Sequence, residues 1–227
     1  MSLLKKIGWT LTAAAILYGA WLMLLLTLPY TAFEKYTDFL ITKQRVYPIR
    51  HWRISFYLHV FVSISVLITG LLQFSKYLLD KYPRLHRNSG KIYAIVVIFL
   101  SGPSGLVMGF YANGGIYARI SFVLLSILWI FFTTMGWRTA MQAHWPAHIT
   151  WMLRSYALTL SALTLRFYAL LLGLMHMPLR PVTAYITISW LSWTVNLLLA
   201  ELLLKRVLIK RMGIKTAVSP DGNTAAI

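Results

Sequence analysis

The stretch ISFYLHVFVSISVLITGLLQFSKYL, residues 54–78, decides the fold. A helix needs about 20 mainly apolar residues to cross the hydrocarbon core of a bilayer, and this stretch is longer than that. Five further apolar stretches of similar length occur in the chain. The sequence therefore predicts an all-α, polytopic transmembrane helical bundle with six spans, at residues 7–28, 54–78, 92–111, 120–141, 151–174 and 182–204.

The composition excludes several classes of protein. Of the 227 residues, 59% are hydrophobic and 12% are charged, whereas soluble domains are nearer half apolar and a quarter charged. The formal net charge of +17 would suggest a nucleic-acid partner in a soluble protein. Here we interpret the basic residues as flanking charges of the spans, and expect the lipid bilayer as partner and no nucleic acid. The chain has no cysteine, which excludes disulfides, thiolate metal sites and covalently attached c-type haem.

The distribution of basic residues predicts the orientation. With the N-terminus in the cytoplasm, 14 of the 22 Lys and Arg residues lie on the cytoplasmic side and 7 on the outer side. The positive-inside rule therefore places both termini in the cytoplasm. Residues 205–227 are expected to form a basic, partly disordered cytoplasmic tail. The basic and aromatic loop at residues 30–53 is external in this topology, and we expect it to lie along the outer surface.

The span at residues 54–78 carries a stripe of polar and small residues. His59, Ser63, Val66, Gly70 and Gln73 follow one another at four-three spacing, which places them on one helix face. At about 1.5 Å per residue, His59 lies about 7 Å from the outer end and Gln73 about 21 Å further in. We take His59 and Gln73 as candidate cofactor-binding residues. The alternative is that both side chains only form hydrogen bonds to neighbouring helices.

A second stripe of residues on one helix face begins at His148, just before the span at residues 151–174, and runs into that span. Its end members, His148 and Arg166, are aligned but about 27 Å apart, so Arg166 should lie near the depth of His59. Arg166 either faces the bundle interior or extends to the outer headgroups. Arg154 lies on another face and can reach the inner headgroups. The members of the stripe are His148, Met152, Ser155, Thr159, Ala162 and Arg166.

Two histidines from different helices are expected at the cytoplasmic face. His86 precedes the third span, and His148 precedes the fifth. Two neutral imidazoles on neighbouring helices can ligate haem iron axially, and helix bundles commonly hold such sites. Arg87 or Arg154 would then pair with the haem propionates. The alternative is that both histidines are interfacial residues that titrate at the headgroup level.

Two motifs carry a resemblance to a known family. They are H-R-x-x-G-x-x-Y at residues 86–93 and H-x-x-W-M-x-R-S-x-A-L at residues 148–158. With His59, Gly70 and Gln73, they resemble a family of predicted bacterial membrane proteins catalogued as domain of unknown function 2306, over roughly half of the chain. The resemblance implies a multi-pass protein of the bacterial plasma membrane and no particular activity. A looser similarity to multi-helix b-type cytochromes implies at most one haem b, because the outer side offers no second histidine beside His59.

Three functions remain open from the sequence, and it does not decide whether the protein is an enzyme. The first is a membrane redox protein that binds one haem b through His86 and His148, with His59 and Arg166 forming an outer site for a quinone headgroup. The second is a small transporter or carrier for an anionic or lipid-like solute. The third is a non-catalytic accessory subunit. No phosphate-binding glycine loop, H-E-x-x-H helix or G-x-S-x-G turn occurs in the sequence.

Overall fold

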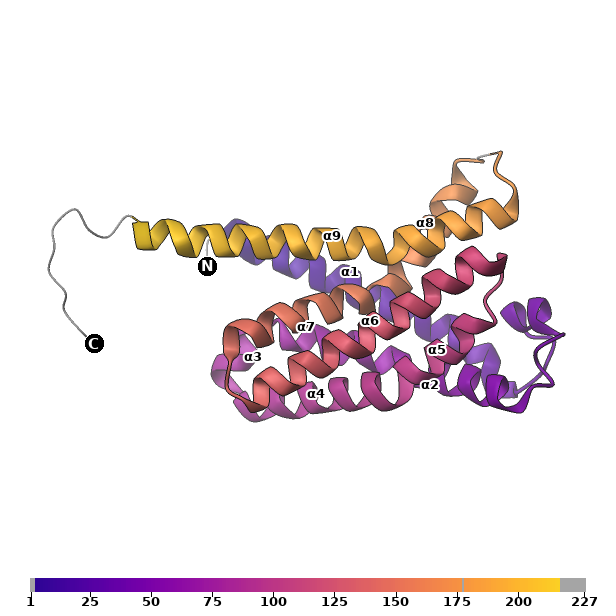
Figure 1. Ribbon diagram of the computed structural model, residues 1–227, viewed down its shortest axis with the longest axis horizontal. Helices are drawn as coiled ribbons and strands as arrows, with labels where there is room; N and C mark the ends of the chain where they lie inside the picture. Colours follow the sequence, from indigo (N-terminus) through magenta and orange to yellow (C-terminus); the bar gives the residue numbers. More distant parts are fainter. Residues whose placement is uncertain (1–2, 177, 217–227) are drawn as a thin grey trace, which may run out of the picture.

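Six long apolar helical segments form the bundle (Figure 1). The computed structural model describes residues 3–176 and 178–216, and all regular secondary structure in these ranges is helical. Six segments are long and apolar enough to cross a membrane, which confirms the predicted all-α bundle. In chain order the elements are α1 (Leu3–Thr27), η1 (Leu28–Ala32), η2 (Asp38–Lys43), α2 (Arg50–Gln73), α3 (Lys76–Lys81), α4 (Pro83–Ile95), η3 (Val96–Ser101), α5 (Gly102–Phe110), α6 (Gly115–Met141), α7 (Trp145–Thr159), α8 (Ser161–Leu174) and α9 (Pro181–Thr216).

The connections between the spans lie at two opposite ends of the bundle (Figure 1). One end carries η1, η2, the α5–α6 turn and the α8–α9 connection, and we call it the cavity end. The other end carries α3 and the α6–α7 turn, and we call it the histidine end. The start of α1 and the end of α9 both lie toward the histidine end. That arrangement follows from an even number of spans, whereas the side of the membrane that this end faces stays a prediction.

The body of the bundle consists of α2, the continuous run α4–η3–α5, α6 and α7 (Figure 1). Its core contains the buried aromatic side chains of Tyr93, Trp129, Phe132 and Tyr156. Outside this body, α1 packs along α2, while α9 packs against α6, α7 and α8. Many large apolar side chains of α1 and α9 remain exposed, as expected for surfaces that face lipid.

The helix boundaries differ from the predicted spans, and the second and third spans show this most clearly. The span predicted at residues 54–78 is divided, because α2 ends at Gln73 and Ser75 caps α3 by accepting a hydrogen bond from the Leu78 amide. The third span begins at Pro83 rather than residue 92. Proline is favoured in a first helical turn, and the polar residues that follow extend the helix beyond its apolar part.

Two segments predicted to lie outside the spans contain helical structure. The loop at residues 30–53 folds back onto the bundle, where Leu40 and the side chain of Lys43 are buried next to Trp52. Its aromatic residues drive this burial, since they pack with Phe56 of α2. The predicted tail is helical up to Thr216 as part of α9. The rest of that tail, residues 217–227, lies outside the described residues.

Candidate functional site

A cavity of about 690 Å³ lies at the cavity end of the bundle. Its walls come from α1, α2, α5, α6, α7, α8 and α9, and residues of η1 and η2 also line it. We call residues 28–47 the covering segment. Most of the lining is apolar and aromatic. The polar side chains that matter most in this lining are Tyr30, Asp38, Lys43, His59, Thr159 and Arg166.

His59 is held in one orientation by the irregular part of the third span. The Nδ1 atom lies 2.9 Å from the carbonyl oxygen of Ser101 and 3.3 Å from Oγ of Ser104. Ser101 is the last residue of η3, a π-helical turn, and Pro103 after it has no N–H to donate. Ser63 of α2 donates a second cross-helix bond to Oγ of Ser101 at 3.0 Å. The π-turn thus presents a backbone carbonyl and a hydroxyl to α2.

Glycines let the helices approach closely at this level. A Cβ atom at Gly105 would lie 3.0 Å from Cε1 of His59, and one at Gly102 would lie 2.5 Å from Cγ1 of Ile130. At Gly109 the backbone of Phe122 would be 3.2 Å away. The small-residue seam of the third span is therefore a packing surface for α2 and α6, as small residues are in membrane bundles generally.

Arg166 of α8 faces the cavity. Its Nη1 donates to the carbonyl oxygen of Ala162 at 2.9 Å, one turn earlier in the same helix. The side chain is exposed although protein atoms surround it, and it is part of the cavity lining. Among the described residues, no carboxylate lies within salt-bridge distance of it. It stands eight residues before the end of α8, or about 12 Å of helix.

The structure brings His59 and Arg166 together. Both line the cavity, and they lie close enough to interact electrostatically. His59 is nine residues, or about 13 Å, into α2, so the two side chains share a depth near the middle of a span. Of the two alternatives for Arg166, the structure thus favours the one in which its side chain faces the bundle interior. Tyr30 of η1 interacts with Arg166 as well, and no spacing rule in the sequence pointed to it.

Lys43 fastens the covering segment to the bundle. Its Nζ donates to the carbonyl oxygen of Tyr111 at 2.5 Å and to Oδ1 of Asn113 at 2.7 Å. Both acceptors belong to the turn between α5 and α6, and Asn113 also donates to Thr42 at 3.2 Å. Burial, with a smaller effect from the charge of Arg119, lowers the pKa of Lys43 to about 8. Sequence reasoning missed this residue, because a lysine in a basic loop resembles an ordinary surface charge.

A hydroxyl network forms the floor of the cavity. The Tyr93 hydroxyl lies 2.7 Å from the hydroxyl oxygens of both Ser155 and Thr159, and Trp129 donates to Thr159 at 3.0 Å. Ser155 also lies 2.7 Å from the hydroxyl of Thr133. These buried groups satisfy one another, so the network joins α4, α6 and α7 below the cavity. The stripe of residues 148–166 indicated Ser155 and Thr159, but not their partners.

His86 and His148 lie at the histidine end, on α4 and α7. They are close enough to interact electrostatically. Nδ1 of His148 lies 2.9 Å from the carbonyl oxygen of Gly136, whereas the buried Nδ1 of His86 has no hydrogen-bond partner among the described residues. Gln73 donates to Oγ of Ser89 at 2.6 Å and to the His86 carbonyl at 3.2 Å. Gln73 therefore ties α2 to α4, about 21 Å of helix from His59.

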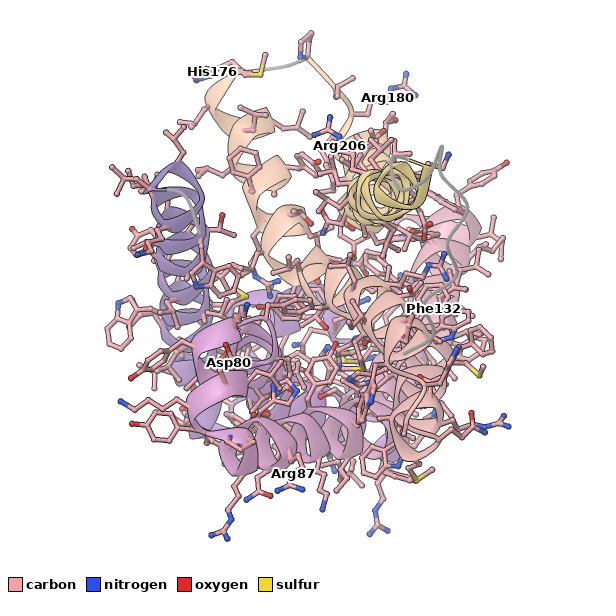
Figure 2. All side chains as sticks on the ribbon, turned by 90° about the vertical axis from the view of Figure 1, so that its left-hand side faces the viewer. Asp80, Arg87, Phe132, His176, Arg180 and Arg206 are labelled. Carbon is pink, nitrogen blue, oxygen red and sulfur yellow. The ribbon has the colours of Figure 1, made fainter. Side chains whose placement is uncertain are left out.

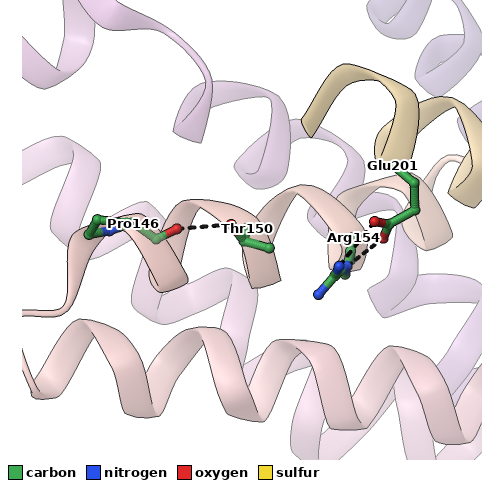
Figure 3. Close-up of polar contacts among 4 residues, drawn as sticks. All are labelled: Pro146, Thr150, Arg154 and Glu201. Carbon is green, nitrogen blue, oxygen red and sulfur yellow. Dashed lines mark hydrogen bonds and ion pairs between the residues drawn. The ribbon is translucent and has the colours of Figure 1, made fainter. Parts of the chain in front are cut away.

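The two arginines predicted as propionate partners are placed differently from each other. Arg154 binds Glu201 of α9, with Nε to Oε1 at 2.5 Å and Nη2 to Oε2 at 3.0 Å (Figure 3). It pairs with this carboxylate rather than with lipid headgroups. Arg87 is exposed, and its side chain points away from the bundle (Figure 2).

The surroundings of His86 and His148 fit a haem only in part. A histidine that donates Nδ1–H to a backbone carbonyl, as His148 does to Gly136, is oriented as metal ligands usually are. The packing nearby is close, since a Cβ at Gly136 would lie 2.6 Å from Sδ of Met152. Neither histidine lines the cavity. The imidazoles suit iron, whereas Arg154 is paired with Glu201, Arg87 is exposed, and the packing at Gly136 leaves little room for a porphyrin.

A comparison with known protein families shows one family to which the chain is similar. The model of a family described as "Predicted membrane protein (DUF2306)" matches residues 56–204. The chain belongs to the DUF2306 family. The DUF2306 match includes His59, Arg166 and the two histidines of the histidine end, which confirms the resemblance. The covering segment lies before the DUF2306 match. No curated protein and no solved structure matches the chain.

Proposed function

We propose that this multi-pass membrane protein binds a membrane-soluble amphiphile in the cavity, with the headgroup of the amphiphile at Arg166. The observation that carries the proposal is a guanidinium that faces a cavity near the middle of a span, with no carboxylate within salt-bridge distance among the described residues. Ionisable groups at membrane depth are costly and usually mark a ligand or ion path. An anionic headgroup, or one with strong acceptor oxygens, would offset this cost.

The chemistry of arginine narrows the headgroup. Guanidinium presents parallel N–H groups that match carboxylate and phosphate oxygens in pairs. Of the Arg166 nitrogens, Nη1 is engaged with Ala162, which leaves further donors for a ligand. A carboxylate, a phosphate or a quinone carbonyl would each be a suitable acceptor.

The size and lining of the cavity favour an amphiphile over a small inorganic anion. Its 690 Å³ fall within the range of about 300–1,000 Å³ that is usual for small-molecule sites. Met108, Phe122 and Leu125 line the cavity and offer apolar contact to a tail or ring. These features support a carrier for an anionic or lipid-like solute and also a quinone site. The family description supports a membrane location, which we propose is the bacterial plasma membrane, and the charge bias supports an orientation in which the cavity end faces outward.

A binding assay with laurate tests the proposal. The purified protein is reconstituted into phosphatidylcholine nanodiscs, and binding of radiolabelled laurate is measured by scintillation proximity. We expect saturable binding that weakens at least about tenfold in Arg166→Leu. The matched control is Arg180→Leu, an exposed arginine beside the cavity end that does not line the cavity (Figure 2). Binding that is equal in wild type and Arg166→Leu would refute the proposal.

Haem binding at the histidine end is a second candidate, although the close packing between Gly136 and Met152 would have to open to admit a porphyrin. It is favoured by the buried, unpartnered Nδ1 of His86 next to a carbonyl-oriented His148. The test is the visible spectrum of protein purified from haem-supplemented cells. A Soret band that is lost in both His86→Ala and His148→Ala would support this candidate. A colourless wild-type protein, or a band unaffected by both substitutions, would reject it.

A further inference from the structure

The hydrogen bond to Ser101 decides which nitrogen of His59 carries the proton. A carbonyl oxygen only accepts, so Nδ1 at 2.9 Å from it must be the donor. A second positive charge beside Arg166 at this depth is costly, and the neutral ring is therefore the form that a ligand meets. In a neutral ring with a proton on Nδ1, the other nitrogen, Nε2, has a lone pair and accepts hydrogen bonds.

The Nε2 atom of His59 is open to the cavity. It makes no hydrogen bond among the described residues, and it is not one of the buried nitrogens that lack a partner. It therefore keeps accessible surface, and His59 is part of the cavity lining. A ligand that places an O–H group here gains a hydrogen bond, whereas a carboxylate or ether oxygen would meet a lone pair.

Arg166 supplies the opposite requirement at the same depth. Its guanidinium group only donates hydrogen bonds, so it binds an acceptor oxygen of the ligand. His59 and Arg166 together thus favour a headgroup that has one hydroxyl to donate and another oxygen to accept. An ionised fatty acid meets the requirement of Arg166 but not that of His59.

The walls of the cavity favour a flat headgroup. Phe39 of the covering segment is nearly parallel to Phe56 of α2, at 17° with centroids 6.0 Å apart, and Phe56 is nearly parallel to Trp52, at 17° and 5.5 Å. All three side chains line the cavity. Trp52 and Phe56 are almost fully buried, so it is Phe39, which keeps exposed surface, that offers offset-stacked or edge contacts to another ring.

Building on the proposed function, we infer that the ligand is an amphiphile with a hydroxylated aromatic headgroup, of the hydroquinone type. One hydroxyl donates to Nε2 of His59, and the second oxygen accepts from Arg166. The ring lies against Phe39, which extends the stacked rings of Trp52 and Phe56. The inference concerns binding alone and requires no electron transfer.

Three probes that differ in whether they have an aromatic ring and O–H donors test the inference. They are decylhydroquinone, its dimethyl ether and laurate, each radiolabelled and measured under argon with protein in phosphatidylcholine nanodiscs. The ether keeps the ring, tail and acceptor oxygens, and a methyl group replaces the hydrogen of each O–H donor. We expect wild-type protein to bind decylhydroquinone about tenfold more tightly than the ether.

The variant His59→Asn isolates the accepting nitrogen. An asparagine amide can still donate to Ser101 in place of Nδ1, but it has no atom at the position of Nε2. We expect this variant to bind hydroquinone and ether equally, while its affinity for laurate stays within about twofold of wild type. His176→Asn, at an exposed histidine outside the cavity, should keep the wild-type preference.

The outcomes separate the two proposals. Equal binding of hydroquinone and ether by wild type overturns the inference, and this comparison needs no variant to fold. A preference that persists in His59→Asn overturns it as well. If laurate binding depends on Arg166 but hydroquinone has no advantage over its ether, the proposed function stands and only the inference fails. If none of the three probes binds, both fail.

Discussion

Arg154 of α7 and Glu201 of α9 form a two-pronged ion pair across the bundle, with N–O distances of 2.5 and 3.0 Å (Figure 3). Both side chains are partly exposed in the protein alone, at 24% and 36%. In a bilayer their surroundings are poor in water, so either charge without its partner is unfavourable. The pair therefore fixes α9 against α7, and it uses the one acidic residue inside a span.

Breaking this pair should destabilise the protein more than removing both charges. We expect Glu201→Gln to lower the free energy of unfolding by about 2 kcal/mol, because it leaves the Arg154 charge without a partner. The double variant Arg154→Leu with Glu201→Leu should recover at least half of that loss. Unfolding by SDS titration from mild detergent measures both. A double variant no more stable than Glu201→Gln would show that the two side chains are not coupled.

The covering segment should become more stable as the pH rises above 8. The pKa of Lys43 is lowered to about 8 in the folded protein, while an unfolded lysine titrates near 10.4. Between these values the unfolded chain binds more protons, so folding becomes more favourable with rising pH. From pH 7 to pH 9.5 the gain should be about 2 kcal/mol.

Thermal unfolding midpoints at several pH values check this expectation. Lys43→Met should remove the gain, because it leaves no titrating group at this position. Lys35→Met, at an exposed lysine of the same segment, is the matched control and should behave as wild type. A gain that persists in Lys43→Met would assign the pH dependence to another group.

Gly70 should tolerate no side chain. A Cβ atom there would overlap the ring of Tyr156, which is buried and held by a 3.0 Å hydrogen bond from its hydroxyl to the Leu67 carbonyl. We expect Gly70→Ala to lower the free energy of unfolding by about 1–3 kcal/mol through overpacking. Gly8→Ala in α1, where no atom lies within 4 Å, should be neutral or slightly stabilising. Equal stability of the two variants in an SDS titration would contradict this packing.

Tyr93→Phe should weaken the floor of the cavity. Removing this buried hydroxyl deprives Ser155 and Thr159 of a partner, with an expected loss of about 1–2 kcal/mol. Tyr117→Phe, at an exposed tyrosine of α6, should change stability by less than about 0.5 kcal/mol. The quantity to measure is the thermal midpoint in detergent. No difference between the two variants would indicate that the network contributes nothing to stability.

Local sequence signals predicted the helices and their inward faces. The stripe from His59 to Gln73 faces the bundle because its four-three spacing repeats the helical period. His59 and Arg166 lie at one depth, as predicted from a rise of about 1.5 Å per residue along each helix. The division after Gln73 was not predicted, since a capping serine inside an apolar run has little effect on hydropathy.

Contacts between distant segments were beyond such signals. Lys43 joins residues 68 and 70 positions away in the chain, and Arg154 joins one 47 positions away. These separations along the chain are unrelated to the helical period. A lysine or glutamate also contributes the same hydropathy whether its side chain is paired or solvated. The partner of each therefore had no local sign in the sequence.

The sequence by itself determined that this chain is a six-span membrane bundle, and which helix faces turn inward, because the bilayer thickness and the helical period are local constraints. Only the tertiary structure decided that the loop at residues 30–53 closes a cavity, and that this cavity contains His59 and Arg166. Helices in lipid associate through close packing at small residues and through individual hydrogen bonds. Those contacts depend on the fit of surfaces that are far apart in the chain.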